Sequence, residues 1–292
     1  TEVLSKQKAF ESIAGYMEYL RPTGISEVQF TPAAHHQLLI DEITRMMEPD
    51  ADCRRLLCSQ PPGSSKSTYL SQLMPTWLLM KNPRLRIVVV TNSESLSDTF
   101  ARKRRAIMLS EQWETLAETT LDPNARALGS MHTREGGYIK ALSVGSTITG
   151  IRADVMLVDD AIGSLEQSMS DTYLEKLWNW FQAEARTRLV PNGVEIVTAT
   201  RWATKDLHGR LKERHRRGME EWRELRIPML ADSPDDPLGR ELGERLWPEY
   251  FSEQHVREAQ ANPILWQAMY QQVPLDAAGS WGSQDKFIRV PK

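Results

Sequence analysis

The chain has 292 residues, 40% hydrophobic and 26% charged, a composition that excludes disorder, collagen and coiled coil as its main state. Its 36 Lys and Arg against 39 Asp and Glu give a net charge of −3, so binding of nucleic acid would need a local basic patch. No apolar run approaches the roughly 18–20 residues of a membrane span. Cys53 and Cys58 are too few for a four-ligand zinc site or a disulfide framework, so we expect inert core thiols.

Apolar strands alternate with amphipathic helices along most of the chain. We predict strands at 54–59, 85–91, 138–142, 154–159 and 194–200, and helices at 31–47, after residue 68, and at 97–108, 170–189 and 205–217. Pro75 is expected to kink the helix in which it lies. Shorter helical pieces follow near 252–259 and 263–271. Continuous apolar strands between amphipathic helices predict a parallel sheet covered on both faces.

The strongest motif lies between the strand at 54–59 and the helix that follows it. Small residues allow backbone N–H groups to wrap a phosphate, a lysine reaches the outer phosphate oxygens, and a hydroxyl binds Mg²⁺. Lys66, as an ammonium exposed at the helix N-terminus, and Ser67 supply the last two. The usual pattern has glycine at the positions of Gln60 and Ser65, and a serine-rich helix cap is the alternative. The predicted nucleotide contacts are Pro62, Gly63, Ser64, Ser65, Lys66, Ser67 and Thr68.

Two acidic residues follow the strand at 154–159, at the edge of a parallel sheet where the phosphate loop also lies. We predict that Asp159 holds Mg²⁺ with Ser67, and that Asp160 orients and deprotonates the attacking water of ATP hydrolysis. Glu166 is the reserve candidate for that second role. The alternative is that the two aspartates simply cap a loop.

The strand at 194–200 ends in Thr198, Ala199 and Thr200. In ATPases of this kind a polar strand tip lies between the two nucleotide-binding motifs and senses the γ-phosphate, so these three residues are predicted to couple hydrolysis to movement. Threonine is also favoured in strands for other reasons, which weakens this signal when taken alone.

Taken in order, these motifs resemble the ATPase part of a large terminase subunit, the DNA-packaging motor of tailed bacteriophages. The resemblance runs from about Phe30 to Gln272. It is carried by 30–32 with His35 and His36, the loop at 61–69, and the segments 150–154, 157–160, 178–188, 198–202 and 206–207. Serine-containing phosphate loops are an accepted variant in that family, whereas Ala161 stands where proline often follows the acidic pair.

The resemblance implies an α/β fold, namely a P-loop NTPase of the ASCE type with a mostly parallel central sheet flanked by helices and helical additions at both ends. The implied domains are a helical segment at 1–47, an ATPase core at 48–230, and a C-terminal subdomain or linker at 231–292. The implied activity is hydrolysis of ATP with Mg²⁺ to drive double-stranded DNA into a procapsid. Further implied partners are the portal protein, the small terminase subunit and other copies of the chain in a pentameric ring, docked on the portal in the host cytoplasm.

The resemblance also implies further site residues. His36 and Gln37 lie where similar proteins contact adenine, and Arg152 and Arg201 compete for the role of arginine finger or sensor. The family implies a C-terminal nuclease with clustered carboxylates, for which too few residues follow 272. We therefore expect a truncated chain or a separate nuclease polypeptide, with 279–283 as a linker.

Three alternatives remain open at this point. One is a P-loop helicase, and another is a catalytically weak portal-docking module. The third is a metal-dependent nuclease that uses Asp154, Asp159 and Asp160. The basic runs at 102–105 and 210–217 are interpreted either as DNA contacts or as solvated helix faces.

Overall fold

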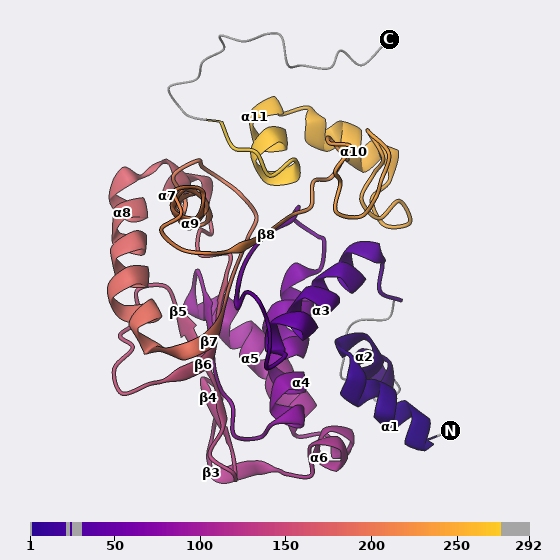
Figure 1. Cartoon of the computed structure of the whole chain (residues 1–292), viewed down its shortest axis with the longest axis vertical. Coiled ribbons are helices and arrows are strands. Elements are labelled where there is room, and N and C mark those ends of the chain that lie inside the picture. The colour runs from indigo at the N-terminus through magenta and orange to yellow at the C-terminus, as the bar shows by residue number, and fades with distance from the viewer. Residues whose placement is uncertain (1, 22–23, 25–30, 276–292) are drawn as a thin grey trace.

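The computed structural model describes residues 2–21, 24 and 31–275, so Phe30 and the expected linker at 279–283 lie outside the described residues. An eight-stranded sheet with the order β3-β4-β5-β2-β6-β7-β1-β8 forms the centre of the molecule (Figure 1). The strands are β1 (Arg55–Ser59), β2 (Arg86–Thr91), β3 (Leu121–Ala127), β4 (Ser130–Thr133), β5 (Tyr138–Ser143), β6 (Ala153–Asp159), β7 (Leu189–Ala199) and β8 (Arg223–Arg226).

The strands from β5 to β8 in this order run parallel, and β3 and β4 add antiparallel pairs at one edge. The predicted mostly parallel sheet is therefore confirmed. β7 lies between β1, which leads into the phosphate loop, and β6, which carries the acidic pair. The sequence pattern did not predict β3, β4 or β8, which are short or largely exposed.

The central strands are buried on both faces because their side chains alternate between two hydrophobic clusters. Leu56 and Cys58 join one cluster, while Leu57 joins the other. The same alternation divides Ile87 from Val88 in β2. Continuous apolar strands of this kind require helices on both sides of the sheet.

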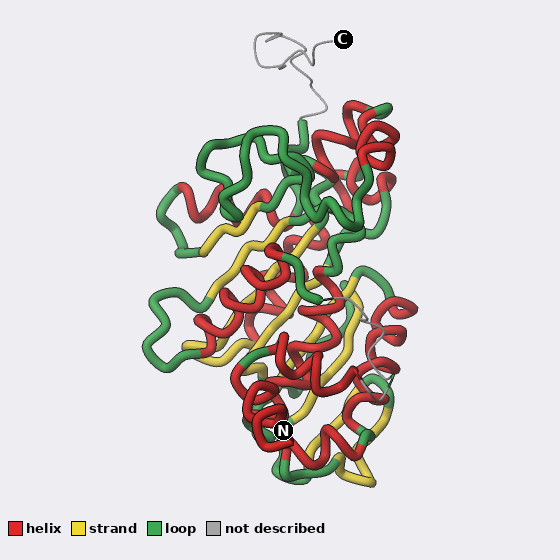
Figure 2. The backbone as a smooth tube through the Cα atoms, turned by 90° about the vertical axis from the view of Figure 1, so that its right-hand side faces the viewer, coloured by secondary structure: helices red, strands yellow, loops and turns green. Residues whose placement is uncertain are grey.

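Helices cover both faces of the sheet (Figures 1 and 2). The first cluster joins one face to α1 (Glu2–Glu11), α2 (Ile13–Leu20), α3 (Ala34–Met47), α4 (Met74–Lys81), α5 (Glu94–Met108) and α6 (Glu111–Ala117). The second cluster joins the other face to α8 (Asp171–Trp180), the π-helix η3 (Phe181–Ala185) and α9 (Leu207–Arg216). The short helix α7 (Leu165–Met169) precedes α8 along the chain, and η4 (Arg186–Arg188) follows η3.

The helix after the phosphate loop changes its winding before Pro75. Residues Thr68–Leu73 form the π-helix η2, and α4 begins at Met74. Pro75 thus occupies the first turn of α4, where a residue without an N–H group is tolerated. The predicted kink at Pro75 stays a prediction.

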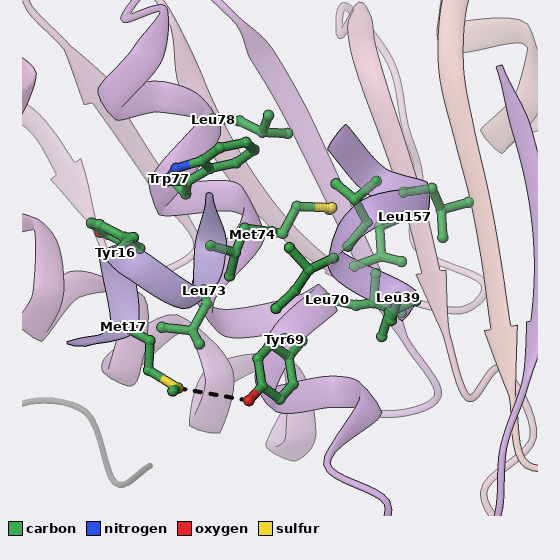
Figure 3. Packing of buried hydrophobic residues seen from close by; sticks show 14 of the residues in the cluster. Tyr16, Met17, Leu39, Tyr69, Leu70, Leu73, Met74, Trp77, Leu78 and Leu157 are labelled. Atoms are coloured by element: carbon green, nitrogen blue, oxygen red, sulfur yellow. Dashed lines mark hydrogen bonds between the residues drawn. The ribbon is translucent and has the colours of Figure 1, made fainter. Parts of the chain in front are cut away.

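The N-terminal helices share a core with the helix after the phosphate loop (Figure 3). Trp77 is buried and its Nε1 donates a hydrogen bond to the carbonyl of Ala9 in α1 at 2.9 Å. The Tyr69 hydroxyl donates to Met17 Sδ in α2 at 3.7 Å, the contact dashed in Figure 3. Residues from α1 to α4 therefore pack as one layer on this face of the sheet.

The segment after β8 forms a small unit with α10 (Glu253–Gln260), α11 (Pro263–Leu265) and the π-helix η5 (Trp266–Tyr270). It lies at one end of the molecule, at the top of Figure 1. Met229 ties it together: its N–H donates to the Tyr270 carbonyl at 2.8 Å, and its carbonyl accepts from Leu246 at 2.7 Å. In the described part of the chain, no helix has both the length and the apolar character that crossing a membrane requires.

Candidate nucleotide-binding site

Three parallel strands end side by side at the candidate site. Ser59 at the end of β1 pairs with Ala199, and Asp159 at the end of β6 pairs with Thr198. The Ala199 carbonyl accepts from the N–H of Gln60 at 3.2 Å, and the Thr198 carbonyl accepts from the N–H of Asp160 at 3.0 Å. The phosphate loop and the acidic pair therefore lie on either side of the tip of β7, at the edge where α/β proteins bind ligands.

The phosphate loop turns through two residues with positive φ. Gly63 has φ +79° and Ser65 has φ +61°. Ser65 thus adopts the left-handed conformation that costs a residue with a Cβ atom roughly 1–2 kcal/mol. This backbone requirement explains why glycine is usual at that position. The loop then leads directly into η2, in line with the predicted strand–loop–helix unit.

Two buried histidines of α3 bond to the backbone of the phosphate loop. Nε2 of His35 and of His36 bond to the Ser64 carbonyl at 3.3 and 3.1 Å. His36 Nδ1 accepts from the N–H of Ala33 at 3.0 Å, so its Nε2 carries the proton and donates. Burial lowers the pKa of His35 to about 4 and that of His36 to about 3, so both rings are neutral near pH 7.

These contacts bear on the predicted adenine site. His36 is buried, and both of its ring nitrogens bond to backbone groups of the protein. In this structure it supports the loop from inside and is not presented to a base. Gln37 is exposed, and its Nε2 donates to Asp41 Oδ1 at 2.7 Å. Of the two predicted residues, only Gln37 lies on the surface.

Lys66 joins the loop, the acidic pair and the strand tip. The prediction of an exposed ammonium is wrong, because the Lys66 side chain is buried. Its Nζ lies 2.6 Å from Asp160 Oδ2 and donates a hydrogen bond to Thr200 Oγ1 at 3.0 Å. The N–H of Thr200 in turn donates to Asp160 Oδ1 at 2.6 Å. Burial opposes the charge of Lys66, but Asp160 and then Asp159 outweigh it and raise the pKa of the lysine. Lys66, Asp160 and Thr200 thus close a polar triangle.

Asp159 is fully buried behind this triangle. Its Oδ2 accepts from Ser71 Oγ at 2.5 Å, whereas its Oδ1 has no hydrogen-bond partner among the described residues. Burial, and then the charge of Asp160, raise the pKa of Asp159 to about 6, against the effects of Lys66 and of the Ser71 and Ser67 hydroxyls. A buried carboxylate oxygen without a partner, close to a serine hydroxyl, is the hard oxygen donor set that Mg²⁺ prefers. These residues fit a magnesium ion.

The two candidate arginines lie at opposite ends of the central parallel strands. Arg201 follows β7 and is buried, and its Nε donates to Asp206 Oδ2 at 2.9 Å. Asp206 also caps α9, so the guanidinium of Arg201 is held within the protein. Arg152 is exposed just before β6, and its Nη1 donates to the Thr187 carbonyl at 3.3 Å. The seven residues of β6 separate it from the acidic pair by roughly 20 Å.

The reserve carboxylate is exposed. Glu166 lies in the first turn of α7, whose N-cap is Ser164. No hydrogen bond or ion pair of the described residues joins its side chain to Lys66, Asp160 or Thr200, and its role in activating water stays a prediction.

The two basic runs fit the interpretation as solvated helix faces only in part: Arg102 is exposed in the first run, but Arg104 is not. Arg104 is fully buried, so it is neither an exposed DNA contact nor part of a solvated face. In the second run, the cations pair with acidic side chains of the protein itself: Arg210 with Glu175, Lys212 with Glu224, Arg214 with Glu220, and Arg216 and Arg217 with Glu213. Arg216 and Arg217 share Glu213 and are largely exposed, so this end of the run fits the interpretation as a solvated helix face.

The nuclease alternative lacks its metal cluster. Asp154 lies at the start of β6, where it binds Arg86 at 2.7 and 2.9 Å, and the other two aspartates lie at the opposite end of the strand. Within residues 2–21, 24 and 31–275, no group of three or more His, Cys, Asp or Glu residues could hold a metal ion.

One part of the site was missed from the sequence. A Cβ atom added to Gly63 would lie 3.4 Å from Phe251 Cε1 and 3.9 Å from Tyr250 Cε1, so the C-terminal unit packs against the phosphate loop. Tyr250 is 61% exposed and stacks on Trp247 with 4.5 Å between ring centroids. No local pattern connects these aromatic residues with the loop, because they approach it only in the folded chain.

The fold is that of a P-loop NTPase, and solved structures with a similar fold include phage large terminases. The large terminase of bacteriophage HK97 has a TM-score of 0.54 at 14% identity, over 79% of this chain and 48% of that one. The large terminase of a thermophilic bacteriophage has a TM-score of 0.50 at 10% identity, over 86% of this chain and 58% of that one. This chain thus spans about half the length of those proteins. No family model matches the sequence, and no curated protein is significantly similar to it.

Proposed function

We propose that this chain is the ATPase motor domain of a phage large terminase subunit, converting ATP and water to ADP and phosphate. The observation that carries the proposal is the polar triangle of Lys66, Asp160 and Thr200 at the adjoining tips of β1, β6 and β7. A lysine held at a phosphate loop beside a carboxylate and a strand tip is the arrangement expected for phosphoryl transfer to water. The fold shared with large terminases supports the choice among ATPases.

Each side chain of the site has a task in this reaction. Backbone N–H groups of residues 62–68 bind the phosphates, and Lys66 stabilises charge on the phosphoryl oxygens. Ser67 and Asp159 hold Mg²⁺, which supplies further neutralisation of that charge when bound. Asp160 accepts the proton of the attacking water. In the present structure Asp160 binds Lys66, so it becomes available when a phosphate draws the lysine away.

The strand tip couples the site to the rest of the sheet. Thr200 contacts both Lys66 and Asp160, and the carbonyls of Thr198 and Ala199 accept hydrogen bonds from the acidic pair and from the loop. A movement of Lys66 would therefore alter its contact with Thr200, the residue that directly follows β7. We propose that this strand transmits the state of the nucleotide to the DNA-moving surface.

The arginine roles follow from their positions. Arg152 lies too far from the acidic pair of its own chain to reach it. As an arginine finger it would therefore contact the nucleotide bound by a neighbouring copy. Arg201, bound to Asp206, positions the segment that follows β7. Glu166 remains the second candidate for the water-activating carboxylate.

The proposed context is packaging of double-stranded DNA in the host cytoplasm. The partners are the portal protein of the procapsid, the small terminase subunit and further copies of this chain in a pentameric ring. The alternatives are a P-loop helicase and a catalytically weak portal-docking module. A strand-separation assay beside a duplex-translocation assay distinguishes the helicase, and measurable ATP turnover excludes the inactive module.

The direct test is ATP hydrolysis by the purified chain and by two lysine variants. Lys66→Ala removes the ammonium at the phosphate loop, and we expect loss of ATP binding and of turnover. Lys176→Ala, on the exposed surface of α8, is the matched control and should retain both. Circular dichroism confirms that each variant is folded. Turnover of Lys66→Ala equal to that of the wild type would contradict the proposed site.

A further inference from the structure

A buried arginine lies behind the proposed metal-binding carboxylate. Arg104 on α5 is fully buried, and its Nη1 donates to the carbonyl of Ser71 at 2.5 Å. Its Nε and Nη2 have no hydrogen-bond partner within the described part of the chain. A buried guanidinium is costly unless an opposite charge compensates it. Asp159 is the carboxylate whose charge favours the guanidinium.

Ser71 connects the two charges. Its carbonyl accepts from Arg104, and its hydroxyl donates to Asp159 Oδ2 at 2.5 Å. One residue of η2 therefore bridges the arginine and the carboxylate. With Oδ2 engaged in this way, Oδ1 is the oxygen of Asp159 that is left without a partner among the described residues.

The sequence makes the Ser71 carbonyl available to Arg104. In an α-helix the N–H of residue 75 would donate to this carbonyl, but Pro75 has no N–H group. The change of winding at η2 occurs at the same place. Pro75 therefore cannot supply the α-helical donor to this carbonyl, and the guanidinium of Arg104 donates to it.

We propose that Arg104 and Ser71 form a positioning pair that orients the Asp159 carboxylate toward the magnesium ion of the bound nucleotide. This inference rests on the proposed function of the site. Groups that hydrogen-bond a metal ligand fix its orientation, and their loss typically lowers metal affinity by about 10–100-fold. The serine provides the direct bond, and the arginine holds the serine in place.

The measurement is binding of a fluorescent ATP analogue over a range of Mg²⁺ concentrations and in excess EDTA. We expect Ser71→Ala to raise the Mg²⁺ concentration needed for half-maximal binding by about 10–100-fold, with binding in EDTA unchanged. Arg104→Met should act in the same direction, and Arg104→Lys, which keeps a positive charge, should recover part of the loss. Ser168→Ala is the matched control, because Ser168 is also a buried helical serine whose hydroxyl donates to a carbonyl, that of Leu165.

The outcomes separate this inference from the function on which it rests. A wild-type chain that binds no nucleotide overturns both. A wild-type chain with Mg²⁺-dependent binding, together with a Ser71→Ala variant of identical Mg²⁺ dependence, overturns only the positioning pair. A merely structural contact would lower the thermal stability of Ser71→Ala without moving its Mg²⁺ dependence. If the arginine variants do not fold, Ser71→Ala decides the result alone.

Discussion

At the scale of single residues, the Asp160 carboxylate cannot pair with Lys66 and face the attacking water at the same time. It forms an ion pair with Lys66 in the present structure, and the proposed reaction needs the same carboxylate to face water. Its backbone has φ +46°, a conformation that a residue with a Cβ atom adopts at a cost. The hydrogen bond from Asn92 Nδ2 to the Asp160 carbonyl, at 3.0 Å, helps to hold this conformation. Strain held in place by neighbours is frequent at functional sites.

The first prediction identifies the water-activating carboxylate. Asp160→Asn keeps an oxygen for the N–H of Thr200 but loses the proton acceptor, so we expect ATP binding to persist while single-turnover hydrolysis falls about 10²–10⁴-fold. Glu166→Gln should leave hydrolysis near the wild-type rate, as should the exposed control Asp171→Asn. Near-normal hydrolysis by Asp160→Asn combined with a loss in Glu166→Gln would assign the role to Glu166.

The second prediction concerns acid stability. His35 is neutral in the folded protein, with a pKa of about 4, and titrates near 6.5 when exposed. Between these values the unfolded chain binds more protons, so His35 makes the free energy of unfolding fall as the pH falls, by up to about 1.4 kcal/mol per pH unit. Asp159 acts in the opposite sense over this range because its pKa is raised.

Urea unfolding of His35→Gln isolates the histidine contribution. Glutamine keeps a donor for the Ser64 carbonyl but does not titrate. We expect the loss of stability from about pH 6.5 to about pH 4.5 to be smaller in this variant than in the wild type. Equal slopes for the two proteins would show that His35 is not neutral and buried in solution.

At the scale of elements, the helix after the phosphate loop is fixed by contacts on several sides. Trp77 in α4 bonds α1, and Trp113 in α6 donates from Nε1 to the Thr76 carbonyl at 3.0 Å. Tyr16 in α2 donates to the Thr76 hydroxyl at 3.1 Å. The helix that carries Lys66 and Ser67 at its start is thereby held by three other helices. We infer that the N-terminal helices help to keep the phosphate loop in position.

The third prediction tests the contact between α1 and α4. Trp77→Phe removes the donor to the buried Ala9 carbonyl and leaves a small cavity, so we expect a loss of about 1–3 kcal/mol in the free energy of unfolding. Trp178→Phe, at a half-buried position on the opposite face of the sheet, should cost less. Proteolysis under native conditions should also cut α1 from Trp77→Phe faster than from the wild type. An unchanged unfolding midpoint would contradict this account.

At the scale of the whole molecule, the two ends of the parallel strands carry different groups. The carboxyl ends carry the loop, the acidic pair and the polar tip of β7, whereas Arg152 is exposed at the amino end of β6. An arginine side chain is far shorter than the roughly 20 Å between the amino and carboxyl ends of β6. A finger in this position can complete only the site of another subunit, as in ring ATPases whose arginine is supplied in trans.

The fourth prediction tests that arrangement by mixing two inactive chains. Lys66→Ala lacks its own phosphate site but presents Arg152, and Arg152→Ala keeps the phosphate site but lacks the finger. We expect the mixture to hydrolyse ATP faster than either variant alone, under conditions where the wild-type rate per subunit rises with protein concentration. Full turnover by Arg152→Ala in dilute solution would show that Arg152 is not the finger.

Several features of this protein follow from the sequence by itself. The strands β1, β2, β6 and β7, and the loop-to-helix unit that contains Lys66 and Ser67, were predictable because they depend on local spacing. A strand buried on both faces and a turn of small residues before a helix can both be recognised from residues that are neighbours in the sequence. The likeness in fold to large terminases agrees with the resemblance that these ordered motifs carry.

Only the tertiary structure decided how charges are paired across the chain. Lys66 was predicted to be exposed and is instead bound to Asp160, and Arg104 lies buried beside Ser71 although its run is typical of a basic surface. Arg201 is held by Asp206 within the protein. A side chain's environment depends on which distant segments the topology brings against it, and periodicity within one helix or strand contains no information about that partner. The fold was therefore predictable from local pattern, while the electrostatics of the site was not.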